Sequence, residues 1–305
     1  MSFEVKSLNV PSTDGIHTLK GKIYIPEGDI KGLFHIVHGM TEHIGRYDRL
    51  MSYMAENGYI SFGYDNLGHG KTADDDSELG FIAEKDGWKY LVNDVNAFGT
   101  AVKEKYPDKE LILMGHSMGS FITRLAAEKF PQNYKKFIIC GTGGKNPMAT
   151  AGLLLTKIIA AIKGKKHISK TVLNMAFGSY NKKFTANTGY EWLTNDITVI
   201  ATYATDKYCS FKFTVSAMHD LIKLCDECNK TAWFKKFSKN IPVFLIAGDC
   251  DPVGDYGKGV TQVYKKLIKN GVKAKIKLYE NYRHEILNDS CRDEVLHDIL
   301  NFVKE

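Results

Sequence analysis

Residues 110–121 read Glu110-Leu111-Ile112-Leu113-Met114-Gly115-His116-Ser117-Met118-Gly119-Ser120-Phe121. The apolar run before Gly115 is typical of a buried strand, and the apolar residues from Phe121 onward follow helical spacing. A turn this sharp has no room for a side chain at the positions two residues before and two residues after its apex. Glycines, Gly115 and Gly119, occupy both positions. The stretch therefore predicts a strand, a strained turn and a helix, with the Ser117 hydroxyl held out for attack.

Strands and helices alternate on both sides of Ser117. Apolar runs predict strands at 32–37, 59–64, 137–141, 241–248 and 275–279, and amphipathic patterns predict helices at 47–57, 86–105, 257–270 and 290–304. Near the N-terminus, 3–9 and 16–25 alternate apolar and polar residues around a turn and predict an antiparallel pair. This order predicts an α/β fold with a mostly parallel sheet of about eight strands and helices on both faces.

The alternation of strand and helix stops at the Gly-rich stretch 141–147 and resumes only at Ile241. Between them, 151–162 predicts an apolar helix, and a polar, aromatic-rich stretch with two or three further helical segments follows. We therefore expect a core formed by residues 1–144 and 239–305. Residues 145–238 are expected to form an inserted helical cap, and we call them the cap segment.

The composition excludes several classes of protein. With 305 residues and 44% apolar side chains, the chain can bury a sizeable core, and no apolar run approaches the length of a membrane span. The first residues lack the apolar stretch of a signal peptide, and six cysteines lie without a disulfide framework, so we expect a cytoplasmic protein. Only 5 of the 41 basic residues are arginine, and this scarcity argues against a nucleic-acid-binding surface.

Two short patterns could suggest metal binding. Cys225-Asp226-Glu227-Cys228 is a single C-x-x-C without a second pair, and Asp74-Asp75-Asp76 lacks the spacing of a calcium loop. A solvated acidic loop is the more common role for such an acidic run. The sequence therefore predicts no metal centre.

Catalytic groups of open α/β sheets collect at the carboxyl ends of the strands, and three candidates lie there: Ser117, Asp251 and His284. A serine hydroxyl needs a histidine to take its proton, and a carboxylate must hold that histidine in the right tautomer. Asp249 competes with Asp251 for this last role, and we favour Asp251 because it lies out in the loop before Pro252.

Other histidines could rival His284 as the base. His38 and His69 each precede a glycine in a turn, so we expect them to hydrogen-bond loop backbones instead. A tetrahedral oxyanion also needs two N–H donors. We expect them from the backbone of Met118, which follows the nucleophile, and of Met40, in the loop after the third strand.

Five motifs in this order resemble the monoacylglycerol lipase and lysophospholipase branch of the α/β-hydrolases, whose domain is also called serine aminopeptidase-like. They cover essentially the whole chain and lie at 38–47 (His-Gly-Met-Thr-Glu-His-Ile-Gly-Arg-Tyr), 65–70 (Asp-Asn-Leu-Gly-His-Gly), 115–119 (Gly-His-Ser-Met-Gly), 248–254 (Gly-Asp-Cys-Asp-Pro-Val-Gly) and 283–288 (Arg-His-Glu-Ile-Leu-Asn). The resemblance implies Ser117 as nucleophile, Asp251 as acid, His284 as base and the Met40 and Met118 amides as the oxyanion hole. Asn66 and Lys71 depart from the family pattern, outside the triad.

The resemblance implies a cofactor-free serine hydrolase that acts on carboxylic esters through an acyl-enzyme. A lysophospholipase or monoacylglycerol lipase is expected, with a small-molecule ester that carries a single acyl chain. The apolar helix at 151–162 could line an acyl tunnel, touch a lipid surface transiently, or simply pack on the core.

Two alternatives remain at this point. A proline-releasing aminopeptidase would use the same triad and would need an acidic anchor for a free amino terminus, for which Glu191, Asp196 and Asp206 are candidates. A binding protein that kept the fold and lost the chemistry is the second alternative. An intact Ser, Asp and His with both glycines argues against it.

Overall fold

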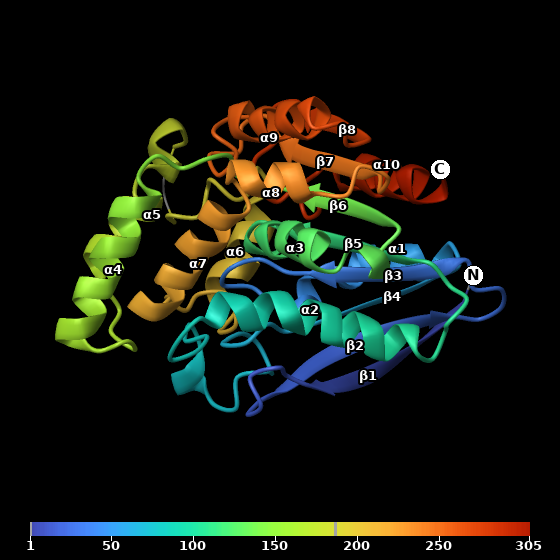
Figure 1. Cartoon of the computed structure of the whole chain (residues 1–305), viewed down its shortest axis with the longest axis horizontal. Helices are drawn as coiled ribbons and strands as arrows, with labels where there is room; N and C mark the ends of the chain where they lie inside the picture. The colour runs from blue at the N-terminus through green and yellow to red at the C-terminus, as the bar shows by residue number, and fades with distance from the viewer. Residues whose placement is uncertain (1, 186–187) are drawn as a thin grey trace.

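The centre of the molecule is one sheet of eight strands, seen in a computed structural model that describes residues 2–185 and 188–305. The strands are β1 (Phe3–Pro11), β2 (Thr18–Pro26), β3 (Gly32–Val37), β4 (Tyr59–Tyr64), β5 (Leu111–His116), β6 (Lys136–Cys140), β7 (Val243–Gly248) and β8 (Ala274–Tyr279). Their order across the sheet is β1-β2-β4-β3-β5-β6-β7-β8, and β2 alone runs against the others (Figure 1). The predicted mostly parallel sheet is confirmed.

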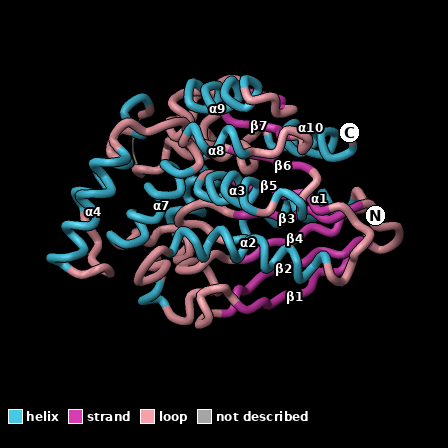
Figure 2. The backbone as a smooth tube through the Cα atoms, in the orientation of Figure 1, coloured by secondary structure: helices cyan, strands magenta, loops and turns pink. Residues whose placement is uncertain are grey.

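Helices cover both faces of this sheet, as Figure 2 shows. Helices α1 (Asp48–Glu56) and α10 (Arg292–Lys304) pack on one face, and α2 (Gly87–Lys103), α3 (Met118–Lys129) and α9 (Lys258–Lys269) pack on the other. Every residue of β3, β4, β5 and β7 is buried, because parallel strands between two helical layers touch solvent on neither face. This explains why these strands are continuous apolar runs in the sequence.

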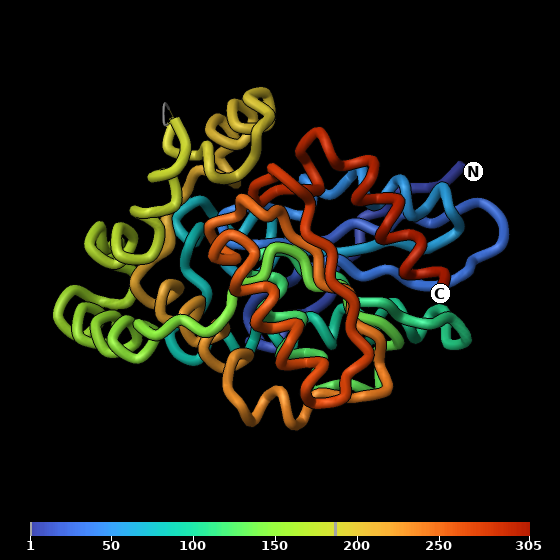
Figure 3. The backbone as a smooth tube through the Cα atoms, turned by 90° about the horizontal axis from the view of Figure 1, so that it is seen from above, coloured from blue at the N-terminus to red at the C-terminus, as the bar shows by residue number. Residues whose placement is uncertain are grey.

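Between β6 and β7 the chain forms α4 (Ala149–Lys163), α5 (Lys170–Phe177), α6 (Ile197–Thr205), α7 (Val215–Glu227) and α8 (Thr231–Lys236). Among the described residues, four α-helices therefore follow the predicted apolar helix, where the sequence indicated two or three helical segments. Helices α5, α6 and α8 have 8, 9 and 6 residues, too few for a clear periodic pattern. Helices α4 to α7 gather beyond the carboxyl ends of the strands, at the left of Figures 1 and 3.

Helix α8 lies within the sequence bounds of the cap segment but packs on the core. The Trp233 indole N–H donates to the Arg124 carbonyl of α3 at 2.9 Å, and the Phe237 ring lies 5.9 Å from Phe137 of β6. The Arg124 guanidinium in turn lies 4.7 Å from the centre of the Trp233 ring. The segment thus returns to the core layer before β7 begins.

Arg124 is fully buried and ties α3 to the loop just before the cap segment and to the residues after α7. Its Nη1 donates to the Gly143 carbonyl at 3.2 Å, and its Nη2 donates to the Cys228 carbonyl at 2.5 Å and to Asn229 Oδ1 at 3.1 Å. Burying a cation is costly unless its hydrogen bonds are made. Here carbonyl and amide oxygens supply them for Nη1 and Nη2, while Nε has no hydrogen-bond partner among the described residues.

The Arg124→Met variant is expected to lower the free energy of unfolding by about 1–3 kcal/mol, because the buried Gly143 and Cys228 carbonyls lose a donor. Denaturant unfolding at neutral pH measures the loss. Arg49→Met is the matched control, because Arg49 makes only an exposed pair with Asp293 and should shift stability by less than about 0.5 kcal/mol. Equal stability of the two variants would contradict the structural role of Arg124.

Candidate active site

Ser117 sits at the junction of β5 and α3 with φ 54° and ψ −121°, a conformation that non-glycine residues rarely adopt. The two flanking glycines explain how the chain reaches it. A Cβ on Gly115 would lie 2.2 Å from the Gly119 carbonyl oxygen, and a Cβ on Gly119 would lie 2.1 Å from that of Val37. Any side chain at either position would collide with backbone. The predicted strand, strained turn and helix are therefore present.

His284 and Asp251 form a buried pair next to this turn. The His284 ring nitrogen Nδ1 lies 2.9 Å from Asp251 Oδ2, and Asp251 Oδ1 accepts the Val253 N–H at 2.8 Å. The competing Asp249 instead accepts the Asn281 N–H at 2.7 Å. The structure thus joins His284 to Asp251, the carboxylate that the sequence analysis favoured, while the chemical role of each residue stays a prediction.

One cavity of about 710 Å³ lies between the core and the cap segment, and Ser117 and His284 both line it. Met40 and Met118 line the same cavity, and Met118 is the first residue of α3, where an N–H has no acceptor within the helix. Much of the wall is apolar and comes from α3, α5 and α7, including Phe121, Leu173, Phe177, Met218, Leu221 and Ile222. Asp251 lies behind His284, fully buried.

His38 and His69 bind loop backbones, as predicted. The Asn66 N–H donates to His38 Nε2 at 2.8 Å, and the Thr41 N–H donates to His69 Nε2 at 3.2 Å. The other ring nitrogens lie 2.8 Å from the Gly39 carbonyl and 2.9 Å from the Leu67 carbonyl. Burial lowers the pKa of His69 to about 3, so its ring is neutral and accepts from Thr41.

A buried charge network that the sequence analysis missed lies under the site. Arg46 forms a two-pronged ion pair with Glu285, at 2.5 and 2.6 Å, and a single contact with Glu42 at 3.1 Å. Glu42 also accepts from the Tyr47 hydroxyl at 2.8 Å, from His116 Nδ1 at 3.2 Å and from the Gly39 N–H. These residues stand in or beside the quoted motifs, but nothing in a single sequence distinguishes a buried glutamate from an exposed one.

The network sets the charges of its members. Burial alone would raise the pKa of Glu42, but the hydrogen bond and charge of His116 and the charge of Arg46 outweigh it and hold that pKa well below its usual range. Burial alone would lower the pKa of His116, but Glu42 and then Glu285 outweigh it and raise that pKa. The His116 ring lies 4.6 Å from the His284 ring, and its Nε2 lies 3.2 Å from the His284 carbonyl. The network thus contacts His284 through the ring of His116.

The cap segment also contacts the loops that carry Thr41, Arg46 and His284. The Tyr203 hydroxyl of α6 shares a hydrogen bond with Thr41 Oγ1 at 2.8 Å, and the Arg46 guanidinium lies 5.0 Å from the Tyr203 ring centre. The Trp192 ring lies 5.2 Å from that of His284, and the Glu285 N–H donates to the Leu193 carbonyl at 2.7 Å. The base loop and the cap segment are therefore held together directly.

Among the described residues, two clusters could supply metal ligands: His43, Asp206 and Cys209, and His17, Asp74 and Glu78. Neither contains Ser117, Asp251 or His284. The six cysteines are free thiols, including Cys225 and Cys228. Among the residues that the structure describes, no helix has the length and apolar content needed to cross a membrane.

The family model described as serine aminopeptidase, S33, matches residues 28–291. The chain belongs to this family. The S33-family hydrolase is 31% identical to a thermostable carboxyl esterase from Bacillus coagulans, whose crystal structure in complex with glycerol superposes with a TM-score of 0.94 over 99% of both chains. It therefore has the α/β-hydrolase fold.

Two curated relatives are named as lipases of monoglycerides. The S33-family hydrolase is 22% identical to the monoacylglycerol lipase of Mycolicibacterium smegmatis over 96% of its own length and 98% of that protein. It is 30% identical to the monoglyceride lipase of Rattus norvegicus over 138 residues, which are 43% of this chain and 44% of the rat protein. These relatives place the chain beside the branch that its motifs resemble.

Proposed function

We propose that this chain is a serine hydrolase of carboxylic esters that carry a single acyl chain, such as monoacylglycerols or lysophospholipids. The observation that carries the proposal is the joint position of Ser117 and His284 on one largely apolar cavity, with His284 Nδ1 bonded to the buried Asp251. The relatives named as esterases and monoglyceride lipases support the same bond type.

In the proposed cycle, Ser117 Oγ attacks the ester carbonyl carbon while His284 Nε2 takes the hydroxyl proton. The Nδ1 side of the ring is engaged with Asp251, which leaves Nε2 to face the nucleophile and stabilises the imidazolium that forms. The Met118 and Met40 N–H groups stabilise the oxyanion. His284 then gives the proton to the leaving alcohol, and a water activated by His284 releases the fatty acid from the acyl-enzyme.

The residues that line the cavity support the proposal that the acyl chain is the part of the substrate that contacts the cap segment. Apolar side chains of α5 and α7 face it, while Lys145, Asn146, Lys258 and Gln262 line another part and could contact a polar head group. A cavity of about 710 Å³ lies in the range typical of pockets that enclose a whole small ligand.

The aminopeptidase alternative needs a free acid for the substrate's amino terminus, and the three candidates are engaged elsewhere. Glu191 accepts from Asn181 and Thr188, Asp196 accepts the Thr198 N–H at the start of α6, and Asp206 binds His43. The acids that do line the cavity are Glu42, Glu285 and Asp255; the first two are both paired with Arg46, and Asp255 is the one that is not. Because all three predicted anchors are engaged elsewhere, the arrangement favours an ester over a peptide. The strained Ser117 favours catalysis over the non-catalytic binding alternative.

We also propose that the outer face of α4 touches lipid surfaces during substrate uptake. Seven of the ten exposed large hydrophobic side chains in the described residues lie between 148 and 197, which is about one sixth of the chain. Leu154, Ile158 and Ile162 form one stripe of α4 at four-residue spacing, while Leu155 and Ile159 pack inward. The helix thus has an inner apolar side that packs and an outer one that is exposed.

Release of p-nitrophenol from esters of acetate through palmitate tests the chemistry, beside an alanine and a proline p-nitroanilide. Ester turnover is expected, and Ser117→Ala should lower kcat by at least about 10³-fold. Asp251→Asn is expected to lower kcat strongly because it leaves His284 in the wrong tautomer. Asp249→Asn is the matched control and should retain activity. Anilide cleavage with little ester turnover would support the aminopeptidase instead.

Hydrolysis of a long-chain ester in vesicles, compared with a water-soluble ester, tests the α4 surface. Replacing Leu154, Ile158 and Ile162 together with serine should lower the vesicle rate by about tenfold or more and leave the soluble rate nearly unchanged, because less apolar area can enter the lipid. Ile16→Ser, at an exposed site outside the cap segment, is the control. Equal loss on both substrates would argue against a lipid-contact role.

A further inference from the structure

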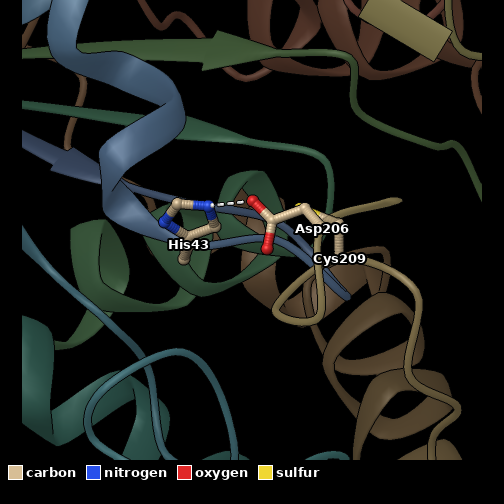
Figure 4. A group of neighbouring side chains, drawn as sticks. All are labelled: His43, Asp206 and Cys209. Carbon is tan, nitrogen blue, oxygen red and sulfur yellow. Dashed lines mark hydrogen bonds and ion pairs between the residues drawn. The ribbon is translucent and has the colours of Figure 1, made fainter. Parts of the chain in front are cut away.

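A cluster of three potential ligands joins the core to the cap segment on the rim of the cavity. His43 comes from the loop after β3, and Asp206 and Cys209 come from the turn after α6. His43 Nε2 lies 3.0 Å from Asp206 Oδ2, and one ligand atom of each of the three residues lies within 4.8 Å of the others. Figure 4 shows the His43 ring and the Asp206 carboxylate facing each other across the two segments, with Cys209 beside Asp206.

Local structure holds the three side chains in this arrangement. The Cys209 N–H donates to the Asp206 carbonyl at 3.0 Å, which places the two side chains on one side of a single turn. The Tyr208 N–H donates to Asp206 Oδ1 at 2.8 Å and leaves Oδ2 directed at His43. A ligand carboxylate oriented by a backbone N–H in this way is a usual feature of metal sites.

The ligand chemistry favours a cation of the zinc class. Imidazole nitrogen, carboxylate oxygen and thiolate sulfur are the three donors that Zn²⁺ uses, whereas Ca²⁺ and Mg²⁺ prefer oxygen alone. Ligands around a tetrahedral Zn²⁺ lie roughly 3.3–3.6 Å apart, given its usual bond lengths. On binding, the His43–Asp206 distance would lengthen slightly. The distances from Cys209 to these two residues would shorten by at most roughly 1.5 Å, and side-chain rotation supplies such changes.

The surrounding charges permit a cation here. Asp206 carries a negative charge, and the Cys209 thiol would add a second when its proton passes to solvent on binding. The charge of Arg46 acts on Asp206, but Glu285 and Glu42 already neutralise that cation. The cluster with a metal bound would therefore be close to neutral.

We propose that His43, Asp206 and Cys209 bind one divalent cation of the zinc class, with water as the fourth ligand, and that this cation fastens the cap segment to the core. Cys209 lines the cavity together with Thr41 and Tyr203, so the cation would fix the rim of the substrate site. The inference concerns a site distinct from Ser117, Asp251 and His284, and it does not depend on the proposed ester chemistry.

The second cluster of acids and histidine is a poorer candidate for such a cation. His17 already bonds Asp14 at 2.5 Å through one ring nitrogen and Glu78 at 3.3 Å through the other. It contains no sulfur, and Asp74 is exposed. It therefore serves as an internal comparison in the test.

Titration of the chelator-treated full chain with Co²⁺ alone tests the site, because a thiolate ligand adds an intense near-ultraviolet charge-transfer band and a tetrahedral site has strong visible bands. We expect one equivalent to give both bands and Zn²⁺ to displace them. Cys209→Ser should abolish the charge-transfer band, and His43→Gln should weaken Co²⁺ affinity by at least about tenfold. Cys250→Ser and His17→Gln are the matched controls and should bind Co²⁺ as the unmodified chain does.

Thermal unfolding gives a second measurement that does not use the bands. A cation that binds only the folded chain raises its stability, so Zn²⁺ should raise the Tm of the unmodified chain and of both controls but not of Cys209→Ser. The absence of Co²⁺ bands, bands that persist in Cys209→Ser, or bands lost only in a control variant would each overturn the proposal. Ester turnover is measured separately, so failure of the metal site and failure of the hydrolase proposal are distinguishable.

Discussion

The buried ion pair of Arg46 with Glu285 is the contact on which the site depends, because the loops that carry the proposed chemistry meet around it. Arg46 belongs to the loop that holds Met40, Glu285 follows the proposed base, and Glu42 extends the network to His116, next to the nucleophile turn. Breaking a buried pair by removing one partner costs about 3–5 kcal/mol, since the remaining charge is left without compensation. The pair therefore fixes the mutual position of three loops that are far apart in sequence.

The same network explains why the histidines of the site have different environments. His38 and His69 accept backbone N–H groups, whereas His116 bonds the Glu42 carboxylate and the His284 carbonyl and packs beside the His284 ring. The carboxylate Asp251 is left to His284 alone among these rings. The different partners of these rings therefore distinguish His284, the proposed base, from the histidines that bind loop backbones.

Much of the core could be predicted from the sequence because its signals are local. Apolar runs marked the buried parallel strands, and the glycines around Ser117 marked a turn in which any Cβ would meet backbone oxygen. The pairing of His284 with Asp251 was favoured because a proline follows that aspartate in the loop. These inferences required only neighbouring residues.

The charge network, the packing of α8 and the ligand cluster could not be predicted, because each depends on contacts between distant residues. Glu42 and Glu285 are 243 positions apart and meet only through Arg46. Trp233 of α8 packs on Arg124, 109 positions earlier in the chain. His43 reaches Asp206 over 163 positions. The number of helices after α4 was underestimated for a different reason, since α5, α6 and α8 have too few residues to show a clear period.

The central claim is that Ser117 is a nucleophile activated by His284. The most direct measurement is the mass of the intact chain and the fragment spectrum of its Ser117 peptide after reaction with a fluorophosphonate ester, which phosphonylates activated serines. We expect one adduct per chain, located on Ser117 and not on Ser120, and its rate of formation should fall sharply in the His284→Ala variant. Labelling at another residue, or equal labelling of native and denatured chains, would contradict the claim.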